Sequence, residues 1–351
     1  MGSHLASRTA RMGYQCATCT AIDKLLVKYR EGCHDGDMRS RYFRALVVGL
    51  LGALVVVLGG CVGDGHAFGT PGAQSIPVGQ STQTIDVGGV TRTFHLYRPP
   101  GLSDGTPLVV MLHGGFGTGA QAERSYHWDG QADAGHFLVA YPDGLNRAWN
   151  AGTCCGEPQR ANTDDVGFIT AMVGAIEQEM PIDRARVYAT GMSNGAMMAL
   201  RLGCQTDTFA AIAPVAGTLL TDCSGARPLS VLQIHGTADD RVPYNGGPGK
   251  AFSADGTARV DGPPVESVNA TWRGIDACGQ PNSTTAGDVI TQTAGCADGR
   301  TVELISVTGA GHQWPGGDPS PLAQWIGNIP APSTALNATD TIWQFFAPNH
   351  R

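Results

Sequence analysis

The sequence has 351 residues, of which 42% are hydrophobic and 15% are charged. This composition is typical of a globular protein with a sizeable core, and despite 49 glycines and 21 prolines it excludes a fibrous or wholly disordered chain. The net charge of -7 excludes a protein that binds nucleic acid through a basic face. Residues 1–60 hold eight Lys or Arg against four Asp or Glu, so the excess of acidic residues lies entirely in the remainder.

The N-terminal part of the chain is organised as an export signal. The basic stretch Arg39–Arg44 precedes the uncharged, apolar run Ala45–Gly60, as in a secretory signal peptide. This run is shorter than the roughly 20 residues that a comfortable bilayer span needs. It ends in Gly59-Gly60-Cys61, which resembles the lipobox of bacterial lipoproteins, in which the cysteine is lipid-modified. We therefore predict a signal peptide over residues 38–60 and a lipidated Cys61, with a plain membrane anchor or a non-lipidated signal as alternatives.

Four segments follow from this interpretation. Residues 1–37 precede the signal start at Met38, so we interpret them as an upstream extension from a misplaced start codon. The cysteines in this extension lack a second zinc half-site. Residues 61–80 are rich in Gly, Ser, Pro and Thr and predict a flexible tether. Residues 81–351 show no internal repeat or second linker, so we predict one domain of the size of a catalytic domain.

Strands and helices alternate along this domain. Continuous apolar strands between helices indicate a mostly parallel sheet covered on both faces, which is the α/β class. The predicted strands are Thr82–Val87, Val90–Tyr97, Leu108–Leu112, Phe137–Tyr141, Arg186–Thr190, Phe209–Val215, Leu229–Ile234 and Val302–Val307. The predicted helices are Asp165–Met180, Asn194–Leu202, Val265–Cys278 and Thr334–Phe346.

A GxSxG motif, Gly191–Gly195, lies directly between a predicted strand and a predicted helix. A serine on such a sharp turn exposes its hydroxyl above the sheet edge, and the flanking glycines avoid clashes. Ser193 is therefore the candidate nucleophile. A glycine-rich loop without catalytic function is the alternative, which the placement disfavours.

A nucleophilic serine needs a base and a carboxylate that orients the base. In this topology they follow the serine in the order Asp, His. Asp239 and Asp240 follow the strand that ends at Ile234, and His312 lies on a glycine-flanked loop after the last strand. We assign Asp239 to the triad and expect the other acid to cap the turn.

An oxyanion hole is expected where Leu112–Gly117 follows the third strand. Glycine lets the main chain approach a substrate closely. We predict donors at the N–H groups of Gly115 or Phe116 and of Asn194, and a structural role for His113 in orienting the loop.

Seven motifs together resemble the polyhydroxybutyrate depolymerase family of α/β-hydrolases, which also contains feruloyl and acetylxylan esterases. They cover the chain in the family's order: LHGG at Leu112–Gly115, YPDG at Tyr141–Gly144, WNAGTCCG at Trp149–Gly156, DDVGFI at Asp164–Ile169, GMSNG at Gly191–Gly195, HGTADDRVPY at His235–Tyr244 and GHQWPGG at Gly311–Gly317. The resemblance implies the α/β-hydrolase fold and the same triad. We expect Asp164 and Asp165 to cap the helix that they open.

The resemblance leaves the substrate open. Only 39 residues follow His312, so we expect no added polymer-binding module and a preference for soluble esters. Trp149, Tyr244 and Trp314 lie in loops at strand ends and could form an aromatic wall that binds substrate; packing explains each equally well.

Six cysteines in the domain predict disulfide bonds in an exported protein. We favour Cys204–Cys223 and Cys278–Cys296, with Cys154 and Cys155 either bonded to each other or to separate partners. No histidine joins them at ligand spacing, so we expect no metal site and no cofactor.

The sequence thus predicts a lipid-anchored or secreted, extracytoplasmic serine esterase that acts as a monomer on small or polymeric esters. The alternatives are a catalytically silent binding lipoprotein and a serine peptidase on the same fold.

Overall fold

The fold is that of a computed structural model, which describes residues 76–251, 259–319 and 330–351. The predicted upstream extension, signal peptide and Cys61 lie outside the described residues. The folded domain begins earlier than residue 81, because Ile76 is buried and its carbonyl oxygen accepts a hydrogen bond of 2.6 Å from Arg98. Within the described ranges, no helix is both long and apolar enough to cross a membrane.

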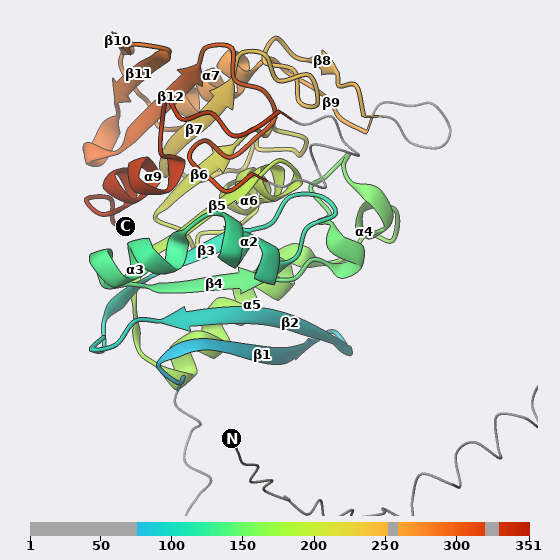
Figure 1. Ribbon diagram of the computed structural model, residues 1–351, viewed down its shortest axis with the longest axis vertical. Coiled ribbons are helices and arrows are strands. Elements are labelled where there is room, and N and C mark those ends of the chain that lie inside the picture. Colours follow the sequence, from blue (N-terminus) through green and yellow to red (C-terminus); the bar gives the residue numbers. More distant parts are fainter. Residues whose placement is uncertain (1–75, 252–258, 320–329) are drawn as a thin grey trace, which may run out of the picture. The chain divides into compact units, whose positions relative to one another are not determined.

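A ten-stranded sheet forms the centre of the domain (Figure 1), in the strand order β1-β2-β4-β3-β5-β6-β7-β12-β11-β10. The six strands from β4 to β12 in this order are parallel, and an antiparallel pair is added at each end. The strands are β1 Gly79–Val87, β2 Val90–Arg98, β3 Thr106–Leu112, β4 Leu138–Pro142, β5 Ile182–Met192, β6 Ala211–Val215, β7 Ser230–Gly236, β10 Asn282–Ala286, β11 Val289–Gly295 and β12 Thr301–Val307. This topology places the carboxyl ends of β5, β7 and β12 at one edge of the sheet, where loops carry Ser193, Asp239 and His312.

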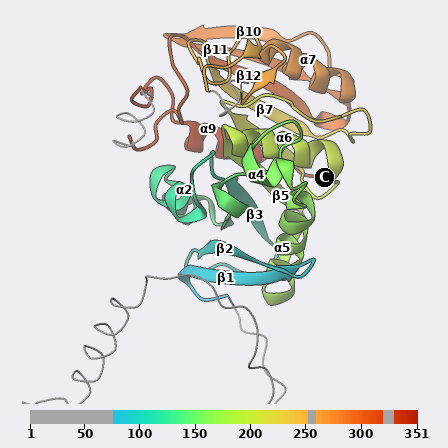
Figure 2. The same ribbon diagram turned by 90° about the vertical axis from the view of Figure 1, so that its right-hand side faces the viewer.

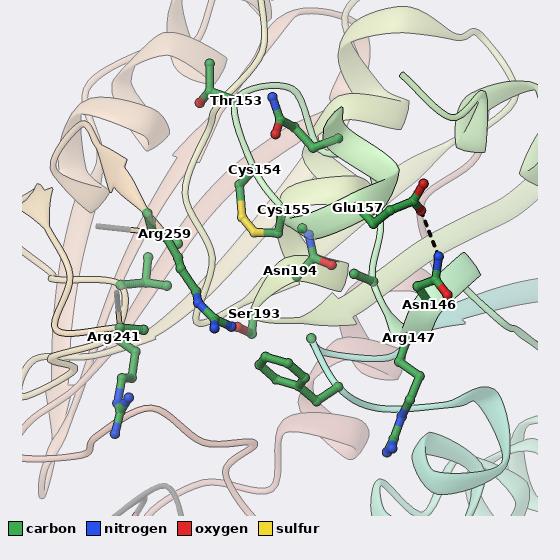
Figure 3. A pocket seen from close by; sticks show the side chains of 18 of the residues that line it. Asn146, Arg147, Thr153, Cys154, Cys155, Glu157, Ser193, Asn194, Arg241 and Arg259 are labelled. Atoms are coloured by element: carbon green, nitrogen blue, oxygen red, sulfur yellow. Dashed lines mark hydrogen bonds between the residues drawn. A yellow bond between two sulfur atoms is a disulfide. The ribbon is translucent and has the colours of Figure 1, made fainter. Parts of the chain in front are cut away.

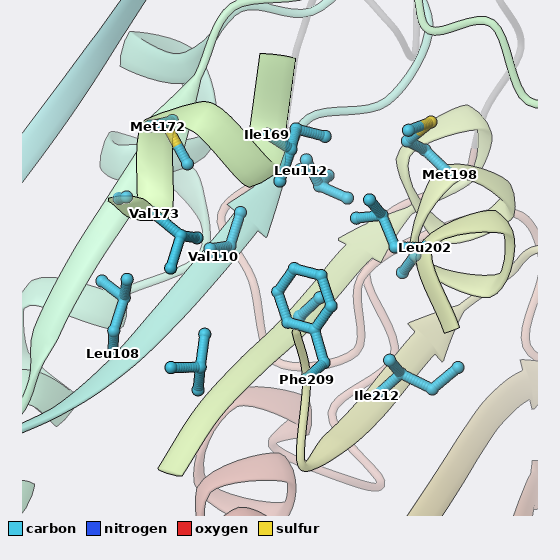
Figure 4. Close-up of a cluster of buried hydrophobic side chains, with 14 of the residues drawn as sticks. Leu108, Val110, Leu112, Ile169, Met172, Val173, Met198, Leu202, Phe209 and Ile212 are labelled. Atoms are coloured by element: carbon cyan, nitrogen blue, oxygen red, sulfur yellow. The ribbon is translucent and has the colours of Figure 1, made fainter. Parts of the chain in front are cut away.

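Helices cover both faces of the sheet (Figure 2). Alternate side chains of each strand point to opposite faces, so Leu108, Val110 and Leu112 of β3 join one buried cluster, and Val109 and Met111 join the other. The first cluster packs against α5 Asp165–Glu179, α6 Asn194–Gln205 and α7 Val265–Ile275, as Figure 4 shows for α5 and α6. The second packs against α2 Gly119–Ser125, α3 Trp128–Gly135 and α9 Ala338–Phe346.

The predicted α/β fold is confirmed, and all eight predicted strands and four predicted helices are present with ends that differ by at most four residues. The prediction missed α2, α3, the short helix α4 Gly156–Arg160 and the hairpin β10–β11. Strand β10 is exposed along its whole length, so it carries no apolar pattern. It forms because its backbone pairs with β11.

Disulfide bonds join Cys204 to Cys223 and Cys278 to Cys296, as predicted. The first ties the C-terminal turn of α6 to the loop before β7, and the second ties the segment after α7 to the end of β11. Cys154 and Cys155 are bonded to each other, which resolves the alternative that the sequence left open.

Candidate active site

The turn between β5 and α6 holds Ser193 in a conformation that few residues adopt, with φ 57° and ψ -119°. A Cβ atom at Gly195 would lie 2.3 Å from the carbonyl oxygen of Leu112, and one at Gly191 would lie 2.6 Å from the backbone of Gly195. Both positions of the motif therefore require glycine. The Ser193 N–H donates to the Val215 carbonyl at 2.9 Å, which fixes the turn to the neighbouring strand β6.

Three side chains from separate loops form one hydrogen-bonded chain. His312 Nε2 lies 2.8 Å from Ser193 Oγ, and His312 Nδ1 lies 2.8 Å from Asp239 Oδ2. Because a carboxylate can only accept, the imidazole donates through Nδ1, which leaves Nε2 to accept the serine proton. This arrangement can remove a proton from the serine hydroxyl.

The environment of Asp239 keeps its carboxylate charged. Oδ1 accepts two backbone N–H groups, from Arg241 and Val242, each at 2.9 Å. Burial alone would raise the pKa of Asp239, but the imidazoles of His312 and His235 outweigh it and lower the pKa below its usual range. His235 Nε2 lies 3.3 Å from Asp239 Oδ2 and 2.8 Å from the Val242 carbonyl oxygen. His235 therefore links the Asp239 carboxylate to the backbone of the loop that carries Asp239.

Asp240 is excluded from this chain of contacts. Its carboxylate is exposed and lies 3.3 Å from Lys250 Nζ and 3.6 Å from Arg241 Nε. The structure thus distinguishes the two neighbouring acids that the sequence could not separate with certainty, and it places Asp239 against the histidine.

Backbone N–H groups beside Ser193 could bind an oxyanion. Gly115 and Asn194 both line the cavity that contains Ser193. Asn194 is the first residue of α6, where an N–H group has no partner within the helix. The Phe116 N–H donates instead to the Arg147 carbonyl at 2.8 Å, so of the two loop donors that the sequence offered, Gly115 is the one left for a substrate.

The side chain of Asn194 ties the nucleophile turn to the loop after β4. Its amide oxygen accepts from the N–H of Trp149 at 2.7 Å, and its amide nitrogen donates to the Trp149 carbonyl at 3.0 Å. His113 supports the same region from the other side, since its Nε2 accepts from the Gly144 N–H at 3.0 Å and its Nδ1 lies 2.8 Å from the Gly114 carbonyl. Burial lowers the pKa of His113, which favours the neutral imidazole that these contacts need.

Asp165 corrects the expectation that both acids at the start of α5 are helix caps. Asp164 is the cap, and its side chain accepts from the Gly167 N–H. Asp165 is fully buried, forms an ion pair of 2.7 Å with Arg92 on β2, and accepts from the Asn150 N–H at 2.8 Å. It thereby holds the loop that contacts Asn194, a role that only the tertiary structure reveals.

A cavity of about 640 Å³ opens beside Ser193 (Figure 3), and His312 also lines it. Its wall contains the disulfide Cys154–Cys155 together with polar and charged side chains from several loops. The lining residues on which the later argument depends are Phe116, Arg147, Glu157, Arg160, Arg241 and Arg259.

The three aromatic residues that the sequence proposed as a substrate-binding wall lie elsewhere. Trp149 is fully buried and donates from Nε1 to the His113 carbonyl at 2.9 Å. Trp314 is buried, stacks on Tyr126 and donates to Thr339. The Tyr244 hydroxyl lies 2.6 Å from Ser306 Oγ. These side chains pack the loops and are absent from the cavity lining, so this expectation was wrong.

Among the described residues, no group of three or more His, Cys, Asp or Glu side chains is arranged to hold a metal ion.

Comparison with known proteins identifies the family. Residues 92–244 match the family described as "Esterase PHB depolymerase". A protein named "Putative esterase NocK" from Nocardia uniformis subsp. tsuyamanensis is 35% identical over 268 residues, which cover 69% of this chain and 76% of that protein. Feruloyl esterase C of Emericella nidulans is 30% identical over 295 residues, covering 80% of this chain and 92% of that protein.

Two further comparisons set the limits of this similarity. Feruloyl esterase B of Piromyces equi is 31% identical over 223 residues, but this chain spans only 39% of that protein's length. The solved structure of an acetyl xylan esterase from Aspergillus awamori matches with a TM-score of 0.53 at 16% identity, over 76% of this chain and 99% of that one, which supports the fold. With an α/β-hydrolase sheet and these relatives, the chain belongs to the PHB depolymerase family of esterases and is a carboxylic ester hydrolase.

Proposed function

We propose that the protein hydrolyses carboxylic esters through an acyl-enzyme on Ser193. The observation that carries this proposal is the hydrogen-bonded chain from Ser193 through His312 to the charged, buried Asp239. In the first half-reaction, the serine oxygen bonds to the ester carbonyl carbon while its proton moves to His312 Nε2. The N–H groups of Gly115 and Asn194 donate to the oxygen that becomes negative.

The first half-reaction ends when the tetrahedral intermediate collapses: its carbon–oxygen bond to the alcohol breaks, and the alcohol leaves with the proton held on His312. The second half-reaction returns the enzyme to its starting state. Water then attacks the acyl-serine and gives its proton to His312, and the carboxylic acid departs as Ser193 regains a proton. Asp239 orients the imidazole and stabilises its charged form throughout.

The substrate class that we propose is a soluble ester of a small acyl or aryl acid, rather than solid polyester. A cavity of about 640 Å³ lies in the range of small-molecule sites. Relatives named as feruloyl esterases point to the same class.

The nucleophile is tested with Ser193→Ala, compared with Ser283→Ala on the exposed strand β10 as the control. We expect Ser193→Ala to lose at least about 10⁴-fold in kcat/KM on p-nitrophenyl esters and to escape labelling by a fluorophosphonate, while the control behaves as wild type. Hydrolysis by Ser193→Ala at the wild-type rate would exclude the mechanism.

A substrate panel tests the class. It compares p-nitrophenyl esters, methyl ferulate, acetylated xylan, a polyhydroxybutyrate film and a peptide amide. We expect soluble esters to be hydrolysed best. Clearing of the film without activity on soluble esters would reverse the order. A folded protein that hydrolyses none of the esters would favour a binding lipoprotein, and hydrolysis of the amide alone would favour a peptidase.

We further propose that the protein works outside the cytoplasm, anchored through a lipid on Cys61. Disulfide bonds such as Cys204–Cys223 persist in oxidising compartments. Stable anchoring requires more than one acyl chain. Mass spectrometry of the native membrane fraction should find a diacylated peptide beginning at Cys61, and Cys61→Ser should release the protein from the membrane. Peptides from residues 12–30 in the mature protein, or unchanged retention of Cys61→Ser, would contradict this.

A further inference from the structure

The described lining of the cavity beside Ser193 is rich in basic residues, whereas the protein is acidic overall. Among the described residues, the lining contains four arginines, Arg147, Arg160, Arg241 and Arg259, and one acidic residue, Glu157. The chain as a whole has 23 basic and 30 acidic residues. Glu157 accepts a hydrogen bond of 2.7 Å from Asn146, and Asp240, which lies 3.6 Å from Arg241, also lies 3.3 Å from Lys250. In the described part of the lining, basic side chains therefore outnumber acidic ones at the site where substrate must enter.

Arg259 is placed at this site by the backbone around it. Its N–H donates to the Ala251 carbonyl at 2.7 Å, and the Gly249 N–H donates to the Val260 carbonyl at 2.9 Å. The short antiparallel pair β8 Gly247–Pro248 and β9 Asp261–Gly262 continues the same ladder. The position of Arg259 thus follows from paired main chain.

The side chain of Arg259 is directed into the cavity. Its guanidinium lies 5.0 Å from the centroid of the Phe116 ring, which is itself 69% exposed. In Figure 3 the guanidinium of Arg259 points toward Ser193. Phe116 directly follows Gly115, whose N–H is the proposed oxyanion donor. The contact with this ring therefore places Arg259 next to the oxyanion loop and leaves the Gly115 N–H available to the substrate.

The other arginines extend the positive region around the cavity. Arg147 also lines the cavity, with its Nε 3.4 Å from the Gly117 carbonyl and its own carbonyl bound to the Phe116 N–H. Arg160 is the last residue of α4, the helix that also contains Glu157, and both residues line the cavity. A neutral substrate would gain little from this arrangement, whereas an anion is attracted and held by charge-assisted hydrogen bonds.

We propose that the site selects esters that carry an anionic group, such as a carboxylate, and that Arg259 is the main residue that binds this anion. The proposal rests on the esterase function of the same site and names its substrate class. Guanidinium groups suit this task because their N–H donors match the two oxygens of a carboxylate.

The experiment compares matched ester pairs that differ in one charge. On the alcohol side, 4-acetoxybenzoate is compared with methyl 4-acetoxybenzoate. On the acyl side, mono-p-nitrophenyl adipate, which has a free carboxylate, is compared with methyl p-nitrophenyl adipate, in which that carboxylate is a methyl ester. For each pair the ratio of kcat/KM, anionic over neutral, is measured for wild type, Arg259→Gln and Arg259→Lys. The control is Arg227→Gln, an exposed arginine paired with Asp207.

We expect wild type to prefer the anionic member of at least one pair by about tenfold, and the preferred pair shows whether the anion belongs to the acyl or the alcohol part. Arg259→Gln should remove most of this preference, Arg259→Lys should keep part of it, and Arg227→Gln should not change it. The preference should also weaken as NaCl is raised, because salt screens partly exposed charges.

Two kinetic results would overturn the proposal and leave the esterase function intact. One is a wild-type enzyme that hydrolyses the neutral member of both pairs as well as the anionic member. The other is an Arg259→Gln variant that loses activity equally on both members, because the arginine would then act on the reacting oxygen.

Failure of wild type to hydrolyse any of the four esters would instead contradict the proposed function itself. Binding of 4-hydroxybenzoate to Ser193→Ala, with methyl 4-hydroxybenzoate as the neutral control, then reports on anion recognition without turnover, and equal affinity for the two would overturn the proposal.

Discussion

Asp239 and Asp240 are adjacent in the chain, yet only Asp239 is buried against His312. Asp239→Asn should lower kcat/KM by about 10⁴-fold, because an amide cannot stabilise the charged imidazole and favours the wrong tautomer. Asp240→Asn should change activity by less than about threefold, since its contacts are exposed ion pairs. Steady-state kinetics checks both variants, with circular dichroism to confirm folding. A large loss from Asp240→Asn alone would contradict the assignment.

Glu123 on α2 is a buried acid outside the active site, with Oε2 4.0 Å from His95 Nδ1. Burial, with a smaller effect from the charge of Asp129, raises its pKa from 4.5 to about 7. Between these values the folded protein keeps a proton that the unfolded chain releases, so this group makes the free energy of unfolding fall as pH rises from about 4.5 to about 7.

The matching variant is Glu123→Gln, which cannot ionise. It should flatten that part of the pH dependence and be more stable than wild type above pH 7, by roughly 1–3 kcal/mol. Urea unfolding at pH 5 and pH 8 measures the effect. An equal change at both pH values would show that ionisation of Glu123 is not the cause.

At the scale of elements, the ion pair Arg92–Asp165 joins β2 to the start of α5 and, through Asn150, to the loop that contacts Asn194. Asp165→Ala should destabilise the fold by about 3–5 kcal/mol, because it leaves the Arg92 charge buried without its partner. The double variant Arg92→Met with Asp165→Leu should cost less than Asp165→Ala alone. Equilibrium unfolding of the three proteins tests this, and a double variant less stable than the single one would contradict it.

The elements that the sequence predicted are those whose physics is local. The buried strands have continuous apolar runs, and the glycines around Ser193 are required by close backbone contacts. Because parallel strands end at one edge of the sheet, their order also predicted which loops bring Ser193, Asp239 and His312 together.

What could not be predicted depends on contacts between distant segments. Trp149 faces the interior because its side chain donates a hydrogen bond to the His113 carbonyl and its backbone is hydrogen-bonded to the Asn194 side chain. Arg259 looks like any surface arginine in the sequence, and only the β8–β9 pairing brings it to the cavity. The exposed strand β10 has no apolar alternation to reveal it.

For the whole molecule, two disulfides close loops of similar size, with sequence separations of 19 and 18 residues. Each should stabilise the fold by about 2–4 kcal/mol, mainly by restricting the unfolded chain. Replacing Cys278 and Cys296 by Ala should lower the free energy of unfolding by that amount with little effect on kcat/KM, since neither residue lines the cavity. Guanidinium unfolding checks the loss, and an unchanged stability would show that the bridge contributes nothing.

The backbone at Ser193 has a further consequence for how stability and activity trade against each other. A non-glycine residue at φ 57° and ψ -119° costs of order 1–3 kcal/mol, which the rest of the domain must offset. Glycine relieves that cost, so Ser193→Gly should unfold at a higher temperature than Ser193→Ala, although both are inactive; equal melting temperatures would show that the turn is unstrained. An inactive variant would then have the higher thermal stability, and only selection for catalytic activity would retain the serine.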